Sequence, residues 1–150
     1  MSFDPVGDYP LGLRRPELVR TATGVALDEI TLAAARAGSL VADDLRATDT
    51  TLRHQAAVAR AAGRRQLADN LERAAELTTV PANELLAIYT ALRPGRSTSA
   101  ELETWAERLD ELAATATAAF VREAAVAYEE RRLLSDERAG QVRPLREGSL

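Results

Sequence analysis

The chain has 150 residues, a formal net charge of −4 and no cysteine, and only 4% of its residues are aromatic. Its length suits one domain, and its negative charge argues against a nucleic-acid binder, which needs a basic face. The lack of cysteine excludes disulfides, thiolate nucleophiles and cysteine metal sites, and an apolar content made mainly of alanine, leucine and valine favours an all-α protein of closely packed helices.

The first 26 residues predict an extended arm with turns, because Pro5, Pro10 and Pro16 interrupt any long helix. The arm is richer in apolar residues than a disordered tail, and it lies either on its own domain or on a partner. Its apolar anchors are Phe3, Tyr9, Leu11, Leu13, Leu18 and Val19. It has no signal-peptide pattern, and no apolar run of the chain would span a bilayer, so we expect a cytoplasmic protein without a membrane partner.

Residues 27–37 predict the first helix. Asp28 and Glu29 lie near its positive amino end, and Gly38 follows as a stop. Residues 39–47 form a connector to the next element.

A long helix is predicted over about residues 49–78. Apolar residues recur there at steps of three and four, and the phase continues through Gly63, which favours one helix over two. The stripe consists of Leu52, Ala56, Ala59, Gly63, Leu67, Leu71, Ala74 and Leu77.

A short apolar helix after Pro81 is the predicted centre of the domain. Pro94 cannot extend it, and Gly95 lets the chain turn. Thr98 and Glu101 have the spacing of a capping box that opens another helix. The predicted apolar face of the short helix consists of Leu85, Leu86, Ile88, Tyr89 and Leu92.

The second long helix is predicted over about residues 98–134. Its stripe keeps a 3–4 alternation and then shifts by one residue, as a straight helix requires. The stripe consists of Leu102, Trp105, Leu109, Leu112, Ala116, Ala119, Phe120, Ala124 and Ala127. The chain is therefore divided into an arm (1–26), a small helical domain (27–134) with two long helices around a short one, and a flexible tail (135–150).

No catalytic constellation emerges from the sequence, so no catalytic, cofactor-binding or metal-binding residue is expected on this chain. His54 is the only histidine, and the acidic pairs alternate with arginines as on a solvated helix face. No phosphate loop, nucleophile elbow or dinucleotide motif is present. Arg93, Arg96 and Arg122 suit an anion clamp, a helix cap or an interface ion pair, and these alternatives stay open.

Several segments resemble, in order and spacing, the small (gamma) subunit of adenosylcobalamin-dependent diol and glycerol dehydratases. The most specific are ALRPGRS at residues 91–97 and AAFVRE at residues 118–123. The others are DYPL at 8–11, RPE at 15–17, TATG at 21–24, LDEITL at 27–32, TL at 51–52, QA at 55–56, RAAEL at 73–77 and VP at 80–81.

This resemblance implies a subunit of an α2β2γ2 enzyme. In that family a large TIM-barrel subunit holds the substrate and a metal ion, and the cobalamin lies between the large (alpha) and medium (beta) subunits. The adenosyl radical abstracts a hydrogen, the 1,2-hydroxyl migrates, and loss of water gives an aldehyde. The small subunit is helical, packs on the large one and supplies no catalytic residue, so cofactor and metal belong to the partners.

The expected function is therefore that of a non-catalytic structural subunit, and the alternative is a free-standing helical interaction module. Aromatic and arginine side chains are favoured at interfaces. We accordingly predict partner contacts at Tyr9, Pro10, Leu11, Arg93, Arg96, Arg122 and Tyr128. Few residues precede the DYPL segment, so no microcompartment-targeting extension is expected, and the tail runs beyond the family's usual end. Propane-1,2-diol and glycerol both stay open as substrates, because the large subunit makes that choice.

Overall fold

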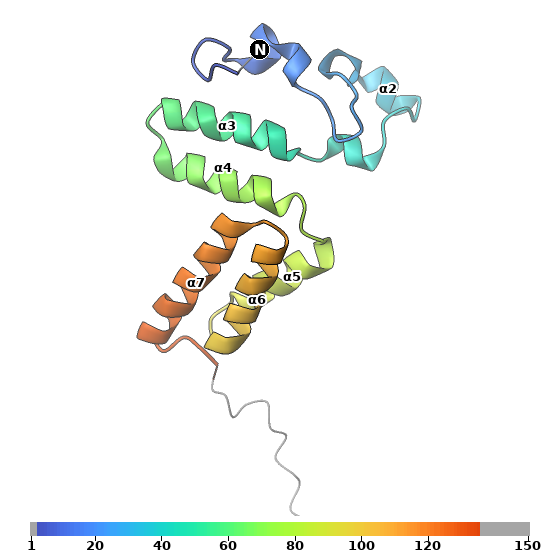
Figure 1. Ribbon diagram of the computed structural model, residues 1–150. Helices are drawn as coiled ribbons and strands as arrows, with labels where there is room; N and C mark the ends of the chain where they lie inside the picture. Colours follow the sequence, from blue (N-terminus) through green and yellow to red (C-terminus); the bar gives the residue numbers. More distant parts are fainter. Residues whose placement is uncertain (1–2, 136–150) are drawn as a thin grey trace, which may run out of the picture. The chain divides into compact units, whose positions relative to one another are not determined.

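The computed structural model describes residues 3–135, and within this range all regular structure is helical (Figure 1). The all-α prediction is confirmed. An isolated antiparallel bridge between Arg20 and Ala26 is the nearest approach to a strand in the described part. The chain divides into two compact units, one ending at Thr79 and one beginning at Val80. This boundary lies within the region 27–134 that the sequence predicts as one helical domain.

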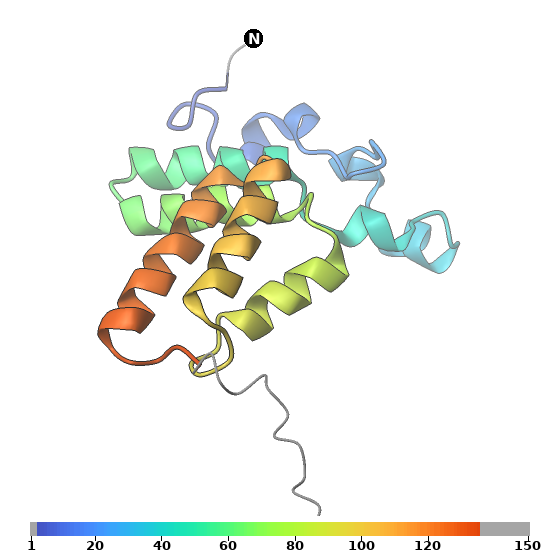
Figure 2. The ribbon, with the colours of Figure 1, turned by 60° about the horizontal axis from the view of Figure 1, so that its bottom comes forward.

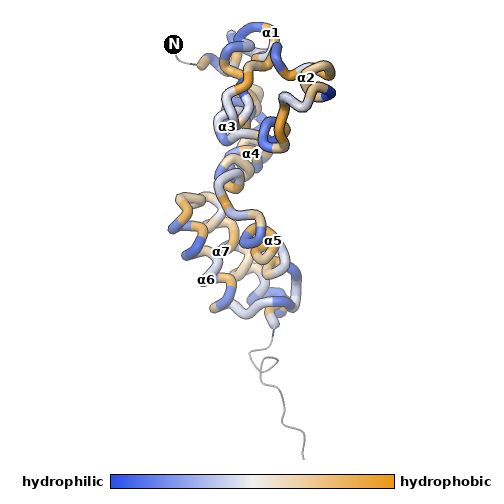
Figure 3. Tube along the Cα trace, turned by 90° about the vertical axis from the view of Figure 1, so that its right-hand side faces the viewer, coloured by the Kyte–Doolittle hydropathy of each residue, from blue (hydrophilic) through white to orange (hydrophobic). Residues whose placement is uncertain are grey.

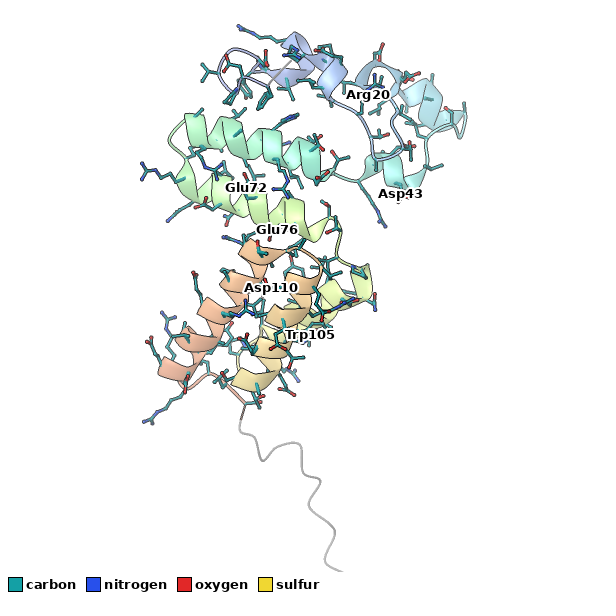
Figure 4. The ribbon with its side chains drawn as sticks, in the orientation of Figure 1. Arg20, Asp43, Glu72, Glu76, Trp105 and Asp110 are labelled. Carbon is teal, nitrogen blue, oxygen red and sulfur yellow. The ribbon has the colours of Figure 1, made fainter. Side chains whose placement is uncertain are left out.

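Unit 1 is built on an antiparallel pair of helices, α3 (Asp49–Ala61) and α4 (Arg65–Leu77). The buried positions between them are alanines, which let the two backbones approach closely. They are Ala56, Ala59, Ala68 and Ala75. Glu72 of α4 faces α3 (Figure 4) and accepts hydrogen bonds from Arg53 Nη1 at 3.1 Å and Arg60 Nη1 at 3.4 Å.

The predicted single helix over 49–78 is wrong, because the chain turns back at Gly63. Gly63 has φ +75°, a left-handed conformation that glycine adopts without strain. The Arg64 N–H bonds to the Ala59 carbonyl at 2.9 Å, and the Gly63 N–H bonds to the Arg60 carbonyl at 3.0 Å. These two bonds form a Schellman motif, which ends α3.

The remainder of unit 1 consists of short elements. These are α1 (Leu11–Arg14), α2 (Leu32–Arg36) and 3-10 turns at Pro16–Leu18, Leu27–Glu29 and Ala42–Leu45. The predicted extended arm is thus only partly extended. The predicted helix over 27–37 is also wrong in its start, because Thr31 caps a new helix by accepting from the Ala34 N–H at 3.1 Å.

Unit 2 contains α5 (Ala82–Ala91), α6 (Ser99–Glu111) and α7 (Thr115–Glu130), with α6 and α7 running antiparallel (Figure 2). The predicted capping box at Thr98 and Glu101 is confirmed: Thr98 N–H donates to Glu101 Oε2 at 2.8 Å, and Glu101 N–H donates to Thr98 Oγ1 at 3.2 Å. Leu102, Leu109 and Val121 are its largest fully buried side chains.

The predicted single helix over 98–134 is wrong as well. Ala113 adopts φ +59°, and the Ala114 N–H bonds to the Leu109 carbonyl at 2.8 Å, which closes a second Schellman motif. Because the chain reverses there, α7 buries a different face from the one predicted. Thr117, Ala118, Val121 and Ala125 are buried, whereas Ala116, Ala119 and Phe120 are exposed.

The predicted tail lies, apart from Ser135, outside the described residues.

Candidate partner interface

The loop between α5 and α6 presents two arginines from a fixed backbone. Gly95 turns the chain with φ +72°, and its N–H donates to the Leu133 carbonyl at 2.6 Å. The Ser135 N–H donates to the Ser97 carbonyl at 2.9 Å, so the residues after α7 hold the loop at two points. Arg93 and Arg96 are exposed, and neither forms an ion pair with a residue that the structure describes.

The predicted apolar face of α5 is divided between core and solvent. Ile88 is buried, whereas Leu86 is 69% and Tyr89 57% exposed. A shallow hollow of about 500 Å³ lies beside Leu86, and Thr90 and Arg96 also line it. Apolar residues run through α5 as they do through the packed helices α6 and α7 (Figure 3). The short helix is therefore only half covered within unit 2.

Arg122 and Tyr128, two predicted contact residues, have partners within their own unit. Arg122 Nε donates to Glu103 Oε1 at 2.8 Å, and its Nη1 donates to Asp110 Oδ2 at 2.9 Å. These bonds join α7 to α6 and raise the pKa of Arg122. The Tyr128 hydroxyl donates to the Leu92 carbonyl at 2.5 Å, which ties α7 to the end of α5. Their role in partner binding stays a prediction.

Asp110, which Arg122 binds, lies on α6, as does Trp105 (Figure 4).

The other predicted contact residues, Tyr9, Pro10 and Leu11, lie in unit 1. Tyr9 is 56% exposed, and the peptide bond between it and Pro10 is cis. Tyr9 and Leu11 line an apolar pocket of about 920 Å³ that the N-terminal segment forms with α3 and α4. Arg15 fixes this segment, because its Nη1 pairs with Asp8 Oδ2 at 2.9 Å and its Nε with Glu17 Oε1 at 2.5 Å.

His54, the single histidine, also lines this pocket and packs against Phe3 in a tilted arrangement, with 4.3 Å between ring centroids and 42° between ring planes. Its Nδ1 is buried and has no hydrogen-bond partner among the described residues. No carboxylate or second histidine joins it there: within residues 3–135, no group of three or more histidine, aspartate or glutamate side chains is placed to hold a metal ion. The residues present do not fit a metal centre.

A buried polar cluster around Asp44 was missed by the sequence analysis. Its carboxylate accepts hydrogen bonds from the Thr21 hydroxyl at 2.8 Å, from the Thr23 hydroxyl and from the Val41 N–H at 2.8 Å. The Thr23, Val41 and Thr21 donors, in that order of effect, lower the pKa of Asp44. The cluster joins the TATG segment to the turn before α3. The only sequence signal for this cluster is the pair of threonines in the TATG segment.

Three acidic residues of the helix faces considered in the sequence bind arginines within unit 2: Glu103 and Asp110 bind Arg122, and Glu111 binds Arg108. Glu84 binds Arg108 Nε at 2.8 Å, and Glu111 binds Arg108 Nη1 at 2.9 Å. The Glu84 hydrogen bond does most to raise the pKa of Arg108. Among residues 3–135 no helix is long and apolar enough to cross a membrane.

Comparison with known proteins gives one consistent result. The family described as "Dehydratase small subunit" matches residues 5–135. The chain is 52% identical over 130 residues to the propanediol dehydratase small subunit of Salmonella typhimurium. The aligned region covers 86% of this chain and 75% of that protein. It is also 52% identical over 130 residues to the propanediol dehydratase small subunit of Citrobacter freundii, with 86% of this chain and 76% of that protein covered.

Proposed function

The chain belongs to the dehydratase small-subunit family, and we propose from this that it is the non-catalytic small subunit of an adenosylcobalamin-dependent propanediol or glycerol dehydratase. It packs on the large subunit of an α2β2γ2 complex in the cytoplasm and stabilises that complex. The complex converts a 1,2-diol into an aldehyde and water, and adenosylcobalamin supplies the radical for this reaction.

The structural observation that supports this proposal best is that each unit leaves several large apolar side chains exposed. Leu13 is 84% and Leu45 77% exposed in unit 1, and Leu86 and Tyr89 are exposed in unit 2. Large exposed apolar surfaces mark interaction sites. A subunit that buries them against a partner stabilises the assembly by mass action.

This chain's own residues are given no step of the reaction. No donor set for a metal ion is found among the described residues, and Glu84, Glu103 and Asp110 are each bound to an arginine. We accordingly assign the cofactor, the metal ion and the substrate to the large and medium subunits.

Co-expression of the tagged chain with the large and medium subunits tests the proposal. The expected result is a stoichiometric complex after affinity capture and size-exclusion chromatography, with aldehyde formed from propane-1,2-diol only when adenosylcobalamin is added. A chain that elutes alone, folded and monodisperse in the presence of both subunits would support the free-standing module instead.

Two single variants extend this test to the predicted contacts. Tyr9→Ala and Arg96→Ala each remove an exposed side chain, and we expect both to weaken assembly without loss of the fold. Arg36→Ala on α2 is the control, since Arg36 is also exposed but was not predicted as a contact. Unchanged affinity of both variants for the large subunit would refute these contacts.

A further inference from the structure

We propose that the outward face of α5 and the loop after it form a docking surface for the large subunit, and that the surface they meet presents carboxylates around an apolar side chain. The surface consists of Leu86, Tyr89, Arg93 and Arg96. This inference rests on the proposed function and adds to it the location and the chemistry of the contact.

The first argument is the mismatch between α5 and its surroundings. Leu86 and Tyr89 are three residues apart and share one face, and both are more than half exposed. Ile88 and Ala91 occupy the buried face. A helix at a permanent water surface carries polar residues opposite its buried stripe, whereas α5 carries a leucine and a tyrosine there. An aromatic residue beside arginine is the usual composition of an interface centre.

The second argument is charge. Residues 85–100 contain Arg93 and Arg96 but no aspartate or glutamate. By contrast, two arginines of α6 and α7 are paired within unit 2: Arg108 binds Glu84 and Glu111, and Arg122 binds two carboxylates of α6. The nearest acidic residue along the chain, Glu101, is engaged in the Thr98 capping box. Arg93 and Arg96, which form no ion pair with any of residues 3–135, therefore fit carboxylates of another chain, which their guanidinium groups can bind in a bidentate manner.

The third argument is that the surface is already ordered. The loop is held to the residues after α7 by the Gly95–Leu133 and Ser97–Ser135 hydrogen bonds, and the end of α5 is held by Tyr128. A surface ordered before binding loses less conformational entropy in the complex.

The shape of the surface indicates how the partner engages it. The hollow of about 500 Å³ opens between Leu86, Thr90 and Arg96. The Thr90 hydroxyl donates to the Leu86 carbonyl at 2.9 Å and is thereby satisfied within α5. An apolar side chain of the partner fits this hollow, and a carboxylate next to it reaches Arg96, which also lines the hollow.

The test uses the full chain with the large and medium subunits, in two double variants. Leu86→Ser/Tyr89→Ser removes the apolar part, and Arg93→Glu/Arg96→Glu reverses the charge. We expect each to lower the affinity for the large subunit at least tenfold. The wild-type affinity should fall as salt rises, whereas the affinity of the charge-reversed variant should rise, because salt screens the repulsion between like charges.

The matched control lies on α2, where Leu32 and Arg36 are also exposed. Leu32→Ser/Arg36→Glu removes one large apolar side chain and reverses one charge, and we expect its affinity to stay within about twofold of the wild type, since α2 lies outside the surface. Hydrogen exchange of the wild-type complex provides a second measurement that needs no variant. Amides of residues 86–97 should be protected in the complex relative to the free chain.

The outcomes separate the two proposals. If wild-type complex forms and turns over substrate, but the α5 variants bind as tightly as the control and residues 86–97 gain no protection, the docking surface is refuted and the subunit function stands. If the variants unfold, the exchange measurement decides. Protection by the medium subunit alone, or dimerisation of the free chain through α5, would overturn the assignment to the large subunit. Failure of the wild type to assemble would overturn both proposals.

Discussion

At the residue scale, the hydroxyl group of Tyr128 stabilises unit 2 through one hydrogen bond between two of its helices. It donates to the Leu92 carbonyl at 2.5 Å from a half-buried position. We expect Tyr128→Phe to lower the free energy of unfolding by about 1 kcal/mol, the usual net value of such a bond. Chemical denaturation measures this change, and Tyr89→Phe is the control because the Tyr89 side chain is exposed. Equal losses in the two variants would contradict the assigned role.

Asp44 makes the stability of unit 1 depend on pH in the acid range. Its pKa is lowered in the folded chain by the Thr23, Val41 and Thr21 donors, so the unfolded chain, with an aspartate pKa near 3.9, takes up the proton first. The stabilisation is therefore complete above about pH 5 and is lost as the pH falls through the folded pKa. We expect the Asp44→Asn variant to be less stable than the wild type at neutral pH. Its unfolding midpoint should also change less as the pH is lowered below about 5. If the unfolding midpoint of the variant depends on pH in the acid range as strongly as that of the wild type, other carboxylates cause this dependence.

At this scale, a contact can be predicted from the sequence when its two residues lie close together along the chain. The Thr98–Glu101 capping box was predictable because both bonds lie within one helical turn. The Asp44–Thr21 bond joins residues 23 positions apart, and no local pattern indicates it. In the same way, the sequence could not separate Arg122, which binds two carboxylates, from Arg96, which binds none among the described residues.

At the element scale, the break at Gly63 yields a test between one helix and two. In a continuous helix, Gly63→Ala would stabilise the chain by about 1 kcal/mol. In the α3–α4 hairpin, an alanine would have to adopt φ +75°, which costs roughly 1–2 kcal/mol, although no neighbouring atom blocks its Cβ. We therefore expect Gly63→Ala to lower the unfolding midpoint. A higher midpoint would support the single helix.

Ala113 is the corresponding position of the α6–α7 hairpin and carries the opposite prediction. It already adopts φ +59°, so Ala113→Gly removes backbone strain in the native state. We expect a gain of about 0.5–1 kcal/mol, since part of the relieved strain is offset by the greater freedom of glycine when unfolded. The same denaturation assay measures it, with Ala100→Gly near the start of α6 as a control that should destabilise. A loss at Ala113 would contradict the hairpin geometry.

These two positions also explain why helix type was predictable and helix number was not. Periodicity indicates helix wherever an apolar stripe recurs, and α6 buries Leu102, Ala106 and Leu109 as the pattern requires. The reversal at residues 112–114 carries no sequence signal, because alanine stands where glycine is usual. In an alanine-rich chain more than one helix face can be read as an apolar stripe. The stripe predicted for one long helix therefore included Ala116 and Ala119, which are exposed in α7.

At the scale of the whole molecule, the similarity to other dehydratase small subunits covers both units, since the family match runs over residues 5–135. The exposed apolar residues are likewise distributed over both units. Stability and assembly should therefore be linked: a partner that binds only the folded chain shifts the folding equilibrium towards it.

This linkage is measurable. With the large subunit in hundredfold excess over its dissociation constant, the chain should gain about 2.7 kcal/mol in free energy of unfolding. Arg93→Glu/Arg96→Glu, which weakens binding, should gain less at the same concentration, while Leu32→Ser/Arg36→Glu should gain as much as the wild type. Hydrogen exchange of the labelled small subunit at increasing large-subunit concentration gives these values. A wild-type stability that does not change with the partner's concentration would mean that the chain does not bind the large subunit, and the free-standing module would then be the better account of its exposed surface.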